Sequence, residues 1–203
     1  MGSTADIVRR ASIAGWVVGG AGLVALVTIG LFFWIGDPFG MINDLALIVV
    51  TAAIPFLMLA YWELGGLTPT PLALVAQIGG WIAAAVWCVT QLLFVLDVVS
   101  IDYAEPATGA YAIESVALIV IGLWISGANL LAGQWLSGIR WLGVVTGAGL
   151  VVFAVGALVS GSYGVLGFIG GPAYVVLLPV WGVVMGRSLG DWRRVRTEGL
   201  RDG

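Results

Sequence analysis

Residues 141–186 read WLGVVTGAGLVVFAVGALVSGSYGVLGFIGGPAYVVLLPVWGVVMG and contain no Asp, Glu, Lys or Arg. As a single α-helix these 46 residues would measure about 69 Å, which is more than twice the hydrocarbon thickness of a bilayer, about 30 Å. The run must therefore reverse direction once. Residues 160–164 are poor helix formers and include a tyrosine suited to the membrane interface, so we predict the turn there.

Four further stretches lack charged side chains, namely residues 11–36, 45–62, 64–96 and 115–139. Of the 203 residues, 61% are hydrophobic and only 9% charged, whereas an average soluble domain is about 25% charged. Because a lipid-exposed backbone must satisfy its own hydrogen bonds, each apolar run is expected to be helical. We predict an all-α polytopic membrane protein whose single bundle of six transmembrane helices occupies residues 1–190, followed by a basic cytoplasmic tail over residues 191–203. The predicted spans are residues 12–35, 44–64, 72–98, 110–133, 138–160 and 164–187.

The eight arginines predict the orientation of the chain. With six spans, Arg9, Arg10, Arg140 and the five arginines after the last span all fall on one side. The positive-inside rule makes this side cytoplasmic, so we expect a multi-pass protein of the cell membrane with both termini in the cytoplasm. The opposite side carries acidic residues without a basic one: Asp37, Asp44, Asp97, Asp102, Glu105 and Glu114.

Missing residue types narrow the possible chemistry. The chain has no Lys and no His, which excludes a Schiff-base lysine, histidine-ligated haem and any catalytic triad with an imidazole base. The single cysteine, Cys88, lies in an apolar run and is expected to be a packing residue. No catalytic motif, cofactor site or metal-ligand spacing is recognisable, so we expect no enzymatic activity, no cofactor and no metal.

Small residues four positions apart recur among the 31 glycines and the alanines. Because lipid tails are as apolar as leucine, membrane helices associate through close backbone approach, which such pairs allow. We expect them to pack helices within one bundle, and a dedicated dimer face is the alternative. The pairs are Gly15 with Gly19, Gly79 with Ala83, Gly143 with Gly147, Gly167 with Gly171, and Gly182 with Gly186.

Prolines interrupt two predicted helices, at Pro55 and at Pro172 and Pro179. Each removes a backbone hydrogen bond and is expected to bend its helix. The strongest predicted break is Gly170–Gly171–Pro172. Broken helices at mid-depth hold the sites of many transporters, whereas a packing kink is the simpler interpretation.

Two neutral polar stripes suggest where a ligand would bind. In the third span, Gln77, Trp81, Ala84, Cys88 and Gln91 share one helical face, and in the fourth span Ser115, Gly122, Ser126, Asn129 and Gly133 do so. We expect these stripes to face each other, either as interhelical hydrogen bonds or as the wall of a cavity near the last helix. The candidate ligand-binding residues are Gln77, Trp81, Cys88, Gln91, Ser126, Asn129 and Tyr174.

Ionisable residues are absent from the middle of every predicted span, so a proton relay is not expected. Asp97 and Glu114 lie about one turn inside their helices, and we expect them to be solvated acidic groups; a shallow cation-attracting mouth is the alternative. At the other side, the arginine-rich tail suits contact with anionic lipid head groups rather than nucleic acid. The head-group candidates are Arg187, Arg193, Arg194 and Arg196.

The close of the last span, Pro179–Val180–Trp181 followed by Gly186–Arg187–Ser188–Leu189 and a basic tail, resembles small six-helix bacterial membrane proteins of unknown function. The resemblance implies the same number of helices and a cytoplasmic C-terminus, and it transfers no catalytic residue.

Three functional hypotheses remain open. The leading one is a non-enzymatic protein that binds a small apolar or lipid molecule, or a partner membrane protein, within the bundle. Its partners would be membrane lipids, with a homo-oligomer possible. The second is a small-solute transporter or channel, which needs a continuous polar path. The third is a structural subunit of a membrane complex, which predicts no pocket and a large exposed glycine-rich face.

Overall fold

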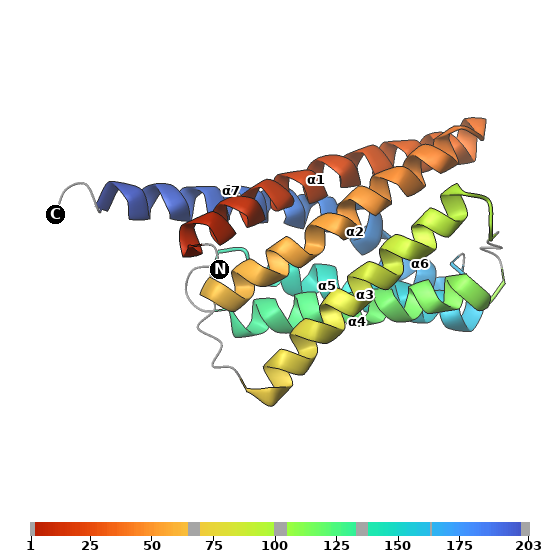
Figure 1. Cartoon of the computed structure of the whole chain (residues 1–203). Helices are drawn as coiled ribbons and strands as arrows, with labels where there is room; N and C mark the ends of the chain where they lie inside the picture. Colours follow the sequence, from red (N-terminus) through yellow and green to blue (C-terminus); the bar gives the residue numbers. More distant parts are fainter. Residues whose placement is uncertain (1–2, 65–69, 100–104, 133–137, 163, 200–203) are drawn as a thin grey trace.

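The computed structural model describes residues 3–64, 70–99, 105–132, 138–162 and 164–199, with side chains as far as Trp192 in the last range. In these ranges the chain forms helices and no strand (Figure 1). Six helical segments are long and apolar enough to cross a membrane, which confirms the all-α, six-span prediction. The elements are α1 (Thr4–Ile35), α2 (Phe39–Leu64), α3 (Pro71–Val95), α4 (Gly109–Leu131), α5 (Arg140–Ser160), α6 (Val165–Pro172), the π-helical segment η2 (Ala173–Leu177) and α7 (Leu178–Gly199).

Local sequence sets the helix ends. The Ser3 hydroxyl oxygen accepts from the Asp6 amide at 3.3 Å, and that of Thr70 accepts from the Ala73 amide at 3.2 Å, so both residues act as N-caps. Gly161 ends α5 with a φ of 75°, a conformation that glycine adopts readily. The predicted reversal in residues 160–164 is therefore confirmed, because it lies between α5 and α6. The segments α6, η2 and α7 follow one another and together form the sixth span.

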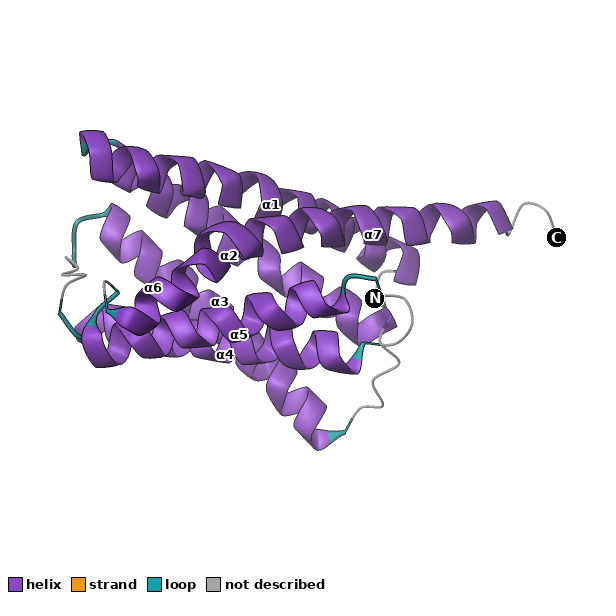
Figure 2. Cartoon of the chain, turned by 180° about the vertical axis from the view of Figure 1, so that it is seen from behind, coloured by secondary structure: helices purple, strands orange, loops and turns teal. Residues whose placement is uncertain are grey.

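The six spans close into a ring. Each of α1 to α5 packs against the next helix along the chain, α5 continues onto α6 and η2, and α7 returns to pack against α1 (Figures 1 and 2). Because α1 and α7 belong to opposite ends of the sequence, their contact closes the ring. The ring interior is therefore bounded by all six spans.

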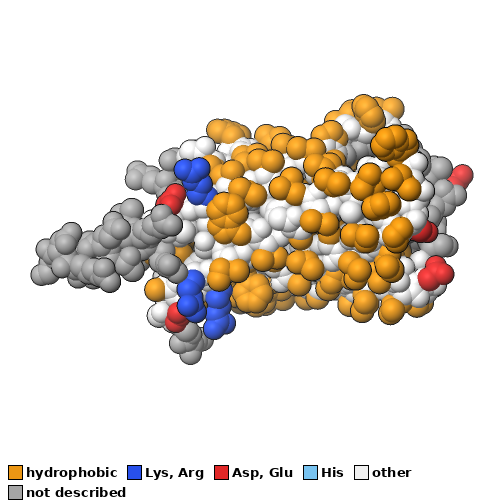
Figure 3. Space-filling model, turned by 90° about the horizontal axis from the view of Figure 1, so that it is seen from above, with side chains coloured by type: hydrophobic (Ala, Val, Ile, Leu, Met, Phe, Trp, Pro, Cys, Tyr) orange, Lys and Arg blue, Asp and Glu red, His pale blue; other side chains and the backbone are white. Residues whose placement is uncertain are grey.

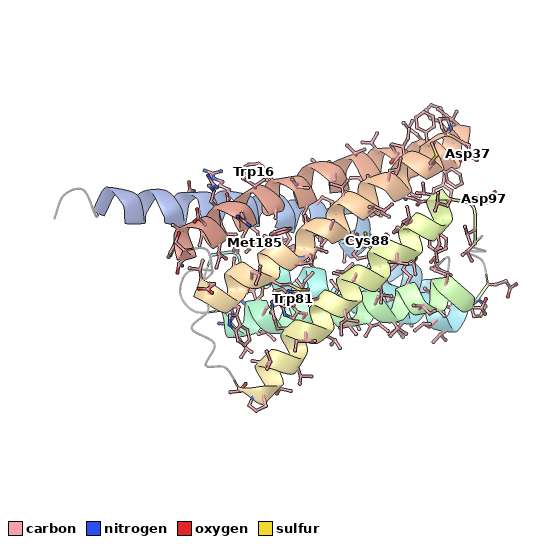
Figure 4. All side chains as sticks on the ribbon, viewed as in Figure 1. Trp16, Asp37, Trp81, Cys88, Asp97 and Met185 are labelled. Carbon is pink, nitrogen blue, oxygen red and sulfur yellow. The ribbon has the colours of Figure 1, made fainter. Side chains whose placement is uncertain are left out.

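The two ends of the bundle differ in charge (Figures 3 and 4). We call the end that carries Arg9, Arg10, Arg140 and Arg187 the basic end, and the end that carries Asp37, Asp97 and Glu105 the acidic end. Exposed hydrophobic side chains cover the surface between them in Figure 3. This band of apolar surface suits contact with lipid.

Glycines bring helices together between α1 and α7, between α4 and α5, and between α5 and α6. A Cβ built on Gly182 of α7 would lie 2.8 Å from the Gly19 nitrogen of α1, and one on Gly122 of α4 would lie 2.6 Å from the Gly147 carbonyl oxygen of α5. No side chain fits at such distances. Of the predicted small-residue pairs, those of α1, α5 and α7 therefore pack helices inside the bundle, as expected.

Large side chains fill the basic half of the ring. Tyr61 of α2, Ile125 of α4 and Met185 of α7 are almost fully buried there. The Tyr61 hydroxyl donates to Asn129 Oδ1 at 2.8 Å, and Asn129 Nδ2 donates to the Ile125 carbonyl oxygen at 2.8 Å. A further bond joins α4 to α5, because the Ser126 hydroxyl donates to the Val144 carbonyl oxygen at 3.0 Å. Polar side chains in this half thus tie helices together.

Helix α7 runs without a break from Leu178 to Gly199 and extends past the basic end of the bundle (Figure 1). It crosses the predicted boundary at residue 190, so the first part of the predicted tail is a continuation of the last span. Pro55 likewise lies inside an uninterrupted α2.

Candidate functional site

A cavity of about 350 Å³ lies inside the acidic half of the ring, with lining side chains from all six spans. Leu47 and Val50 of α2, Leu118 of α4 and Leu178 of α7 form part of its apolar wall. Toward the basic end, the buried side chains of Ile54 and Ile121 follow on α2 and α4. The volume is within the range of small-molecule sites, about 300–1,000 Å³.

A small polar cluster interrupts the apolar wall. Gln91 of α3 and Glu114 of α4 line the cavity and are only 3% and 4% exposed. The Gln91 side-chain nitrogen Nε2 donates to Glu114 Oε1 at 2.7 Å. Gln91 Oε1 and Glu114 Oε2 have no hydrogen-bond partner among the described residues. Both orphan atoms are acceptors, and burying unpaired acceptors is costly.

A second carboxyl group lines the same cavity. Asp44 of α2 lines the cavity as well, and its Oδ1 accepts from the neighbouring Asn43 Nδ2 at 3.2 Å. The indole of Trp87 also lies beside Glu114, but its Nε1 does not reach hydrogen-bond geometry. The polar part of the cavity is therefore acidic.

Aromatic rings form much of the remaining wall. Tyr174 of η2 stacks on Phe153 of α5 with ring centroids 5.0 Å apart and an angle of 21° between the planes. Tyr111 of α4 also lines the cavity, and its hydroxyl is hydrogen-bonded to that of Ser162. Aromatic and carboxyl groups thus line the same cavity.

The π-helical segment brings Tyr174 to this wall. Pro172 has no N–H and ends α6, and the Leu178 N–H then bonds to the Ala173 carbonyl oxygen, five residues back. Ala173 itself is buried against Gly149 of α5. The wider turn follows directly after the predicted break at Gly170–Gly171–Pro172.

The cavity reaches the lipid-facing surface between α1 and α6. Phe33 of α1 and Phe168 of α6 both line it, yet they are 61% and 83% exposed. A molecule dissolved in the membrane therefore has a lateral opening into the site.

The structure brings together only part of the predicted ligand set. Gln91 and Tyr174 line the cavity, as do Gly171 and Pro172, while Gly170 packs against the backbone of Phe153.

Three other members of the set bond between or within helices away from the cavity. Gln77 Oε1 accepts from the Trp124 indole nitrogen at 3.2 Å, and Ser126 and Asn129 make the bonds of the basic half described above.

The remaining two candidates lie elsewhere on α3 (Figure 4). Trp81 is 37% exposed on the outer surface, and Cys88 is half-buried and lies outside the cavity lining. The expectation that the two polar stripes face each other is only partly met. The stripe on α4 turns instead toward α5, because Gly122 and Ser126 pack against Gly147.

Glu114 was expected to be solvated, and the structure corrects this. Its helical position offered a signal, because Leu118, Ile121 and Ile125 follow it at spacings of four, seven and eleven residues and are all buried. Glu114 therefore occupies the inward face of α4. Asp97, by contrast, is exposed at the acidic end, as predicted.

At the basic end, Arg187 is exposed and forms an ion pair with Asp191, with 3.8 Å between Arg187 Nε and Asp191 Oδ2. Together with Arg9, Ser12 and Trp16 these residues line a groove between α1 and α7. The predicted head-group residues Arg193, Arg194 and Arg196 have side chains outside the described part of the chain.

Within the described residues, no group of three or more Cys, His, Asp or Glu side chains is arranged to hold a metal ion. The candidate site is thus an apolar and aromatic cavity with an acidic cluster at its polar side. No family model matches the sequence, and neither a curated protein nor a solved structure is significantly similar to it.

Proposed function

We propose that this chain is a non-enzymatic integral membrane protein that binds a small amphipathic molecule in the cavity of its acidic half. The observation that carries the proposal is the pair of buried, unpartnered acceptors, Gln91 Oε1 and Glu114 Oε2, in an otherwise apolar cavity. Buried polar groups in proteins nearly always have a partner, so orphan atoms that face a cavity indicate that a ligand supplies it.

The shape of the cavity supports a ligand that arrives from the membrane. Its wall is mostly apolar, and two of its lining side chains, Phe33 and Phe168, are largely exposed on the apolar outer surface. A molecule with an apolar body can leave the leaflet sideways and place its polar end against Glu114. A polar solute would have to cross lipid to use this opening, which is costly.

Transport is the second candidate function. The π-helical segment η2 favours it, because π-turns are frequent at functional sites and Tyr174 of this turn lines the cavity. Against it, buried Ile54, Ile121 and Trp181 fill the interior beyond the cavity. Release of a preloaded ligand from proteoliposomes would support transport, whereas binding without release supports a binding protein.

A structural subunit is the weaker alternative. Such a protein would present its close-packing glycines to a partner, yet Gly15, Gly19, Gly182 and Gly186 face one another across α1 and α7. These glycines therefore already pack against a neighbouring helix of the same chain.

Native mass spectrometry of the gently solubilised protein tests the proposal. Gly171 lines the cavity with open space around a Cβ, so Gly171→Phe should block it, while Gly20→Phe on the outer face of α1 is the matched control. We expect a retained small molecule on the wild-type protein and on Gly20→Phe, and its loss from Gly171→Phe. Equal retention by all three proteins, or none by any, would contradict the proposal. The masses in the same spectra also show whether the protein forms a homo-oligomer.

We also propose that the basic end, with both termini, faces the cytoplasm of the cell membrane, because the exposed arginines lie there. Reporter fusions to each terminus should both report the cytoplasmic side. Two termini in different compartments would contradict the six-span topology.

The groove of Arg9, Trp16 and Arg187 supports a contact with anionic lipid head groups at the same end. Replacing both arginines with glutamine should lower retention of phosphatidylglycerol in native mass spectra and leave phosphatidylcholine unchanged. Equal retention of both lipids by the two proteins would remove this contact.

A further inference from the structure

We propose that the cavity selects organic cations, namely amines or quaternary ammonium compounds with an apolar body. This inference rests on the proposed binding function and names the class of ligand. It follows from the charges, the hydrogen-bond acceptors and the aromatic rings that meet in the cavity.

The charged residues that line the cavity are acidic. Glu114 and Asp44 are the acidic members of the lining, and none of the described lining residues is Lys, Arg or His. The two carboxyl groups come from different helices, α2 and α4, and line the same cavity. A cavity whose charged lining is acidic attracts positive charge.

The unpaired hydrogen-bonding atoms of Gln91 and Glu114 also favour a cation. Gln91 already uses Nε2 to donate to Glu114 Oε1, so the atoms left over in the cluster, Gln91 Oε1 and Glu114 Oε2, are both acceptors. Trp87 Nε1 is a neutral donor near Glu114 that does not bond to it. With Glu114 as a carboxylate, an ammonium group completes the cluster, because it carries positive charge and its N–H groups donate hydrogen bonds.

The aromatic wall suits the same chemistry. Tyr111, Phe153 and Tyr174 come from three different spans and line the space that Glu114 also lines. The negative faces of aromatic rings attract cations, and cages of such rings recognise quaternary ammonium groups. The apolar residues around them accommodate the body of the ligand, so the site as a whole suits an amphipathic cation more than a neutral lipid or an anion.

The test uses two probes that differ only in charge: a phenylbutyl trimethylammonium salt and its neutral isostere, in which carbon replaces the ammonium nitrogen. Binding is measured by saturation-transfer NMR on the full chain in dodecyl maltoside micelles, whose head group is neutral and carries no ammonium group. We expect the cation to bind the wild-type protein at least tenfold more tightly than the isostere. Glu114→Gln should remove most of this difference and Asp44→Asn should reduce it.

Glu63→Gln is the matched control, because Glu63 is an exposed glutamate near the basic end. It should leave the preference for the cation unchanged. Glu114→Gln keeps a side-chain oxygen that can accept from Gln91, so its fold should be preserved, and an unchanged melting temperature checks this.

The outcomes separate the two proposals. If both probes bind with equal affinity and Gly171→Phe abolishes both, the cation preference is wrong while the binding function stands. If the cation binds Glu114→Gln as tightly as the wild-type protein, the inference is likewise overturned, because the charge is recognised elsewhere. If neither probe binds and no retained ligand is found by native mass spectrometry, the binding function itself fails.

Discussion

The two halves of the ring use polar side chains in opposite ways. In the basic half, Tyr61 and Asn129 form a hydrogen bond between α2 and α4, surrounded by large buried side chains. In the acidic half, Gln91 and Glu114 also bond across two helices, but each retains an orphan acceptor and faces a cavity. Among the described residues, the basic half also has unpartnered nitrogens, Gln77 Nε2 and Trp181 Nε1, but neither residue lines the cavity. Only the unpartnered atoms of the acidic half are therefore placed to meet a ligand.

This difference assigns stability mainly to the basic half of the bundle and ligand binding to the acidic half. Filled, bonded regions contribute stability, whereas a hollow with unpaired polar atoms reduces it and persists in proteins where a ligand uses it. Substitutions in the basic half should therefore change folding, and those in the acidic half should change binding.

The largest effect is expected from a matched pair of glycine substitutions. Gly147→Leu places a side chain against the Gly122 carbonyl oxygen and should lower the free energy of unfolding by about 3 kcal/mol or more, because overpacking displaces backbone. Gly171 lines the cavity and a Cβ there meets no atom within 4 Å, so Gly171→Leu should change the free energy of unfolding by no more than about 1 kcal/mol while weakening binding. Unfolding titrations in mixed micelles measure both. Similar losses in the two variants would remove the distinction between the halves.

The next effect concerns the bonded pair of the basic half. Asn129→Leu removes the bond between α2 and α4 but leaves the Tyr61 hydroxyl with Met185 Sδ as an acceptor at 3.4 Å, so it should lower the free energy of unfolding by about 1.5 kcal/mol. Binding of the cavity probe should be unchanged after correction for folded protein. The same titration, together with the NMR binding measurement, checks both statements, and a selective loss of binding would place Asn129 in the ligand site.

Replacing the polar pair of the acidic half should not lower the free energy of unfolding. The double variant Gln91→Leu/Glu114→Leu removes both orphan acceptors, so its free energy of unfolding should equal that of the wild-type protein or exceed it by about 1 kcal/mol. Each single variant leaves one partner unpaired and should be less stable than the double variant. A double-mutant cycle measures this coupling. A double variant that unfolds more readily than either single one would show that the pair serves stability.

The smallest effect is expected at Trp81. Since this side chain lies on the outer surface of α3, Trp81→Leu should change the free energy of unfolding by no more than about 0.5 kcal/mol and leave binding unchanged. Reduced probe affinity in this variant would instead support the ligand-contact role predicted from the polar stripe.

Much of the fold was predictable because bilayer thickness constrains helix length. The uncharged run of residues 141–186 could only be two spans, and the turn lies where its glycines and serines are. The small-residue pairs were visible as well, but not that Gly19 meets Gly182. That contact closes a ring between the first and last helices, and local periodicity carries no information about it.

The site was less predictable for a related reason. Gln91 and Tyr174 were proposed from sequence, and both line the cavity. Glu114 was assigned to a solvated end because it lies near the start of its helix, although its spacing to Leu118 and Ile125 places it on the inward face. A cavity is volume that six helices leave unfilled, so no single segment encodes it. The π-turn after Pro172 likewise depends on how that span packs against α5.

Cysteine accessibility tests the difference between the halves most directly. Leu118 and Ile125 lie seven residues apart on the inward face of α4, both are buried, and only Leu118 lines the cavity. In a Cys88→Ser background, a small membrane-permeant thiol reagent should modify Leu118→Cys at least tenfold faster than Ile125→Cys, and the Gly171→Phe substitution should slow only the former. Equal modification rates at the two positions would contradict the distinction between a cavity in the acidic half and close packing in the basic half.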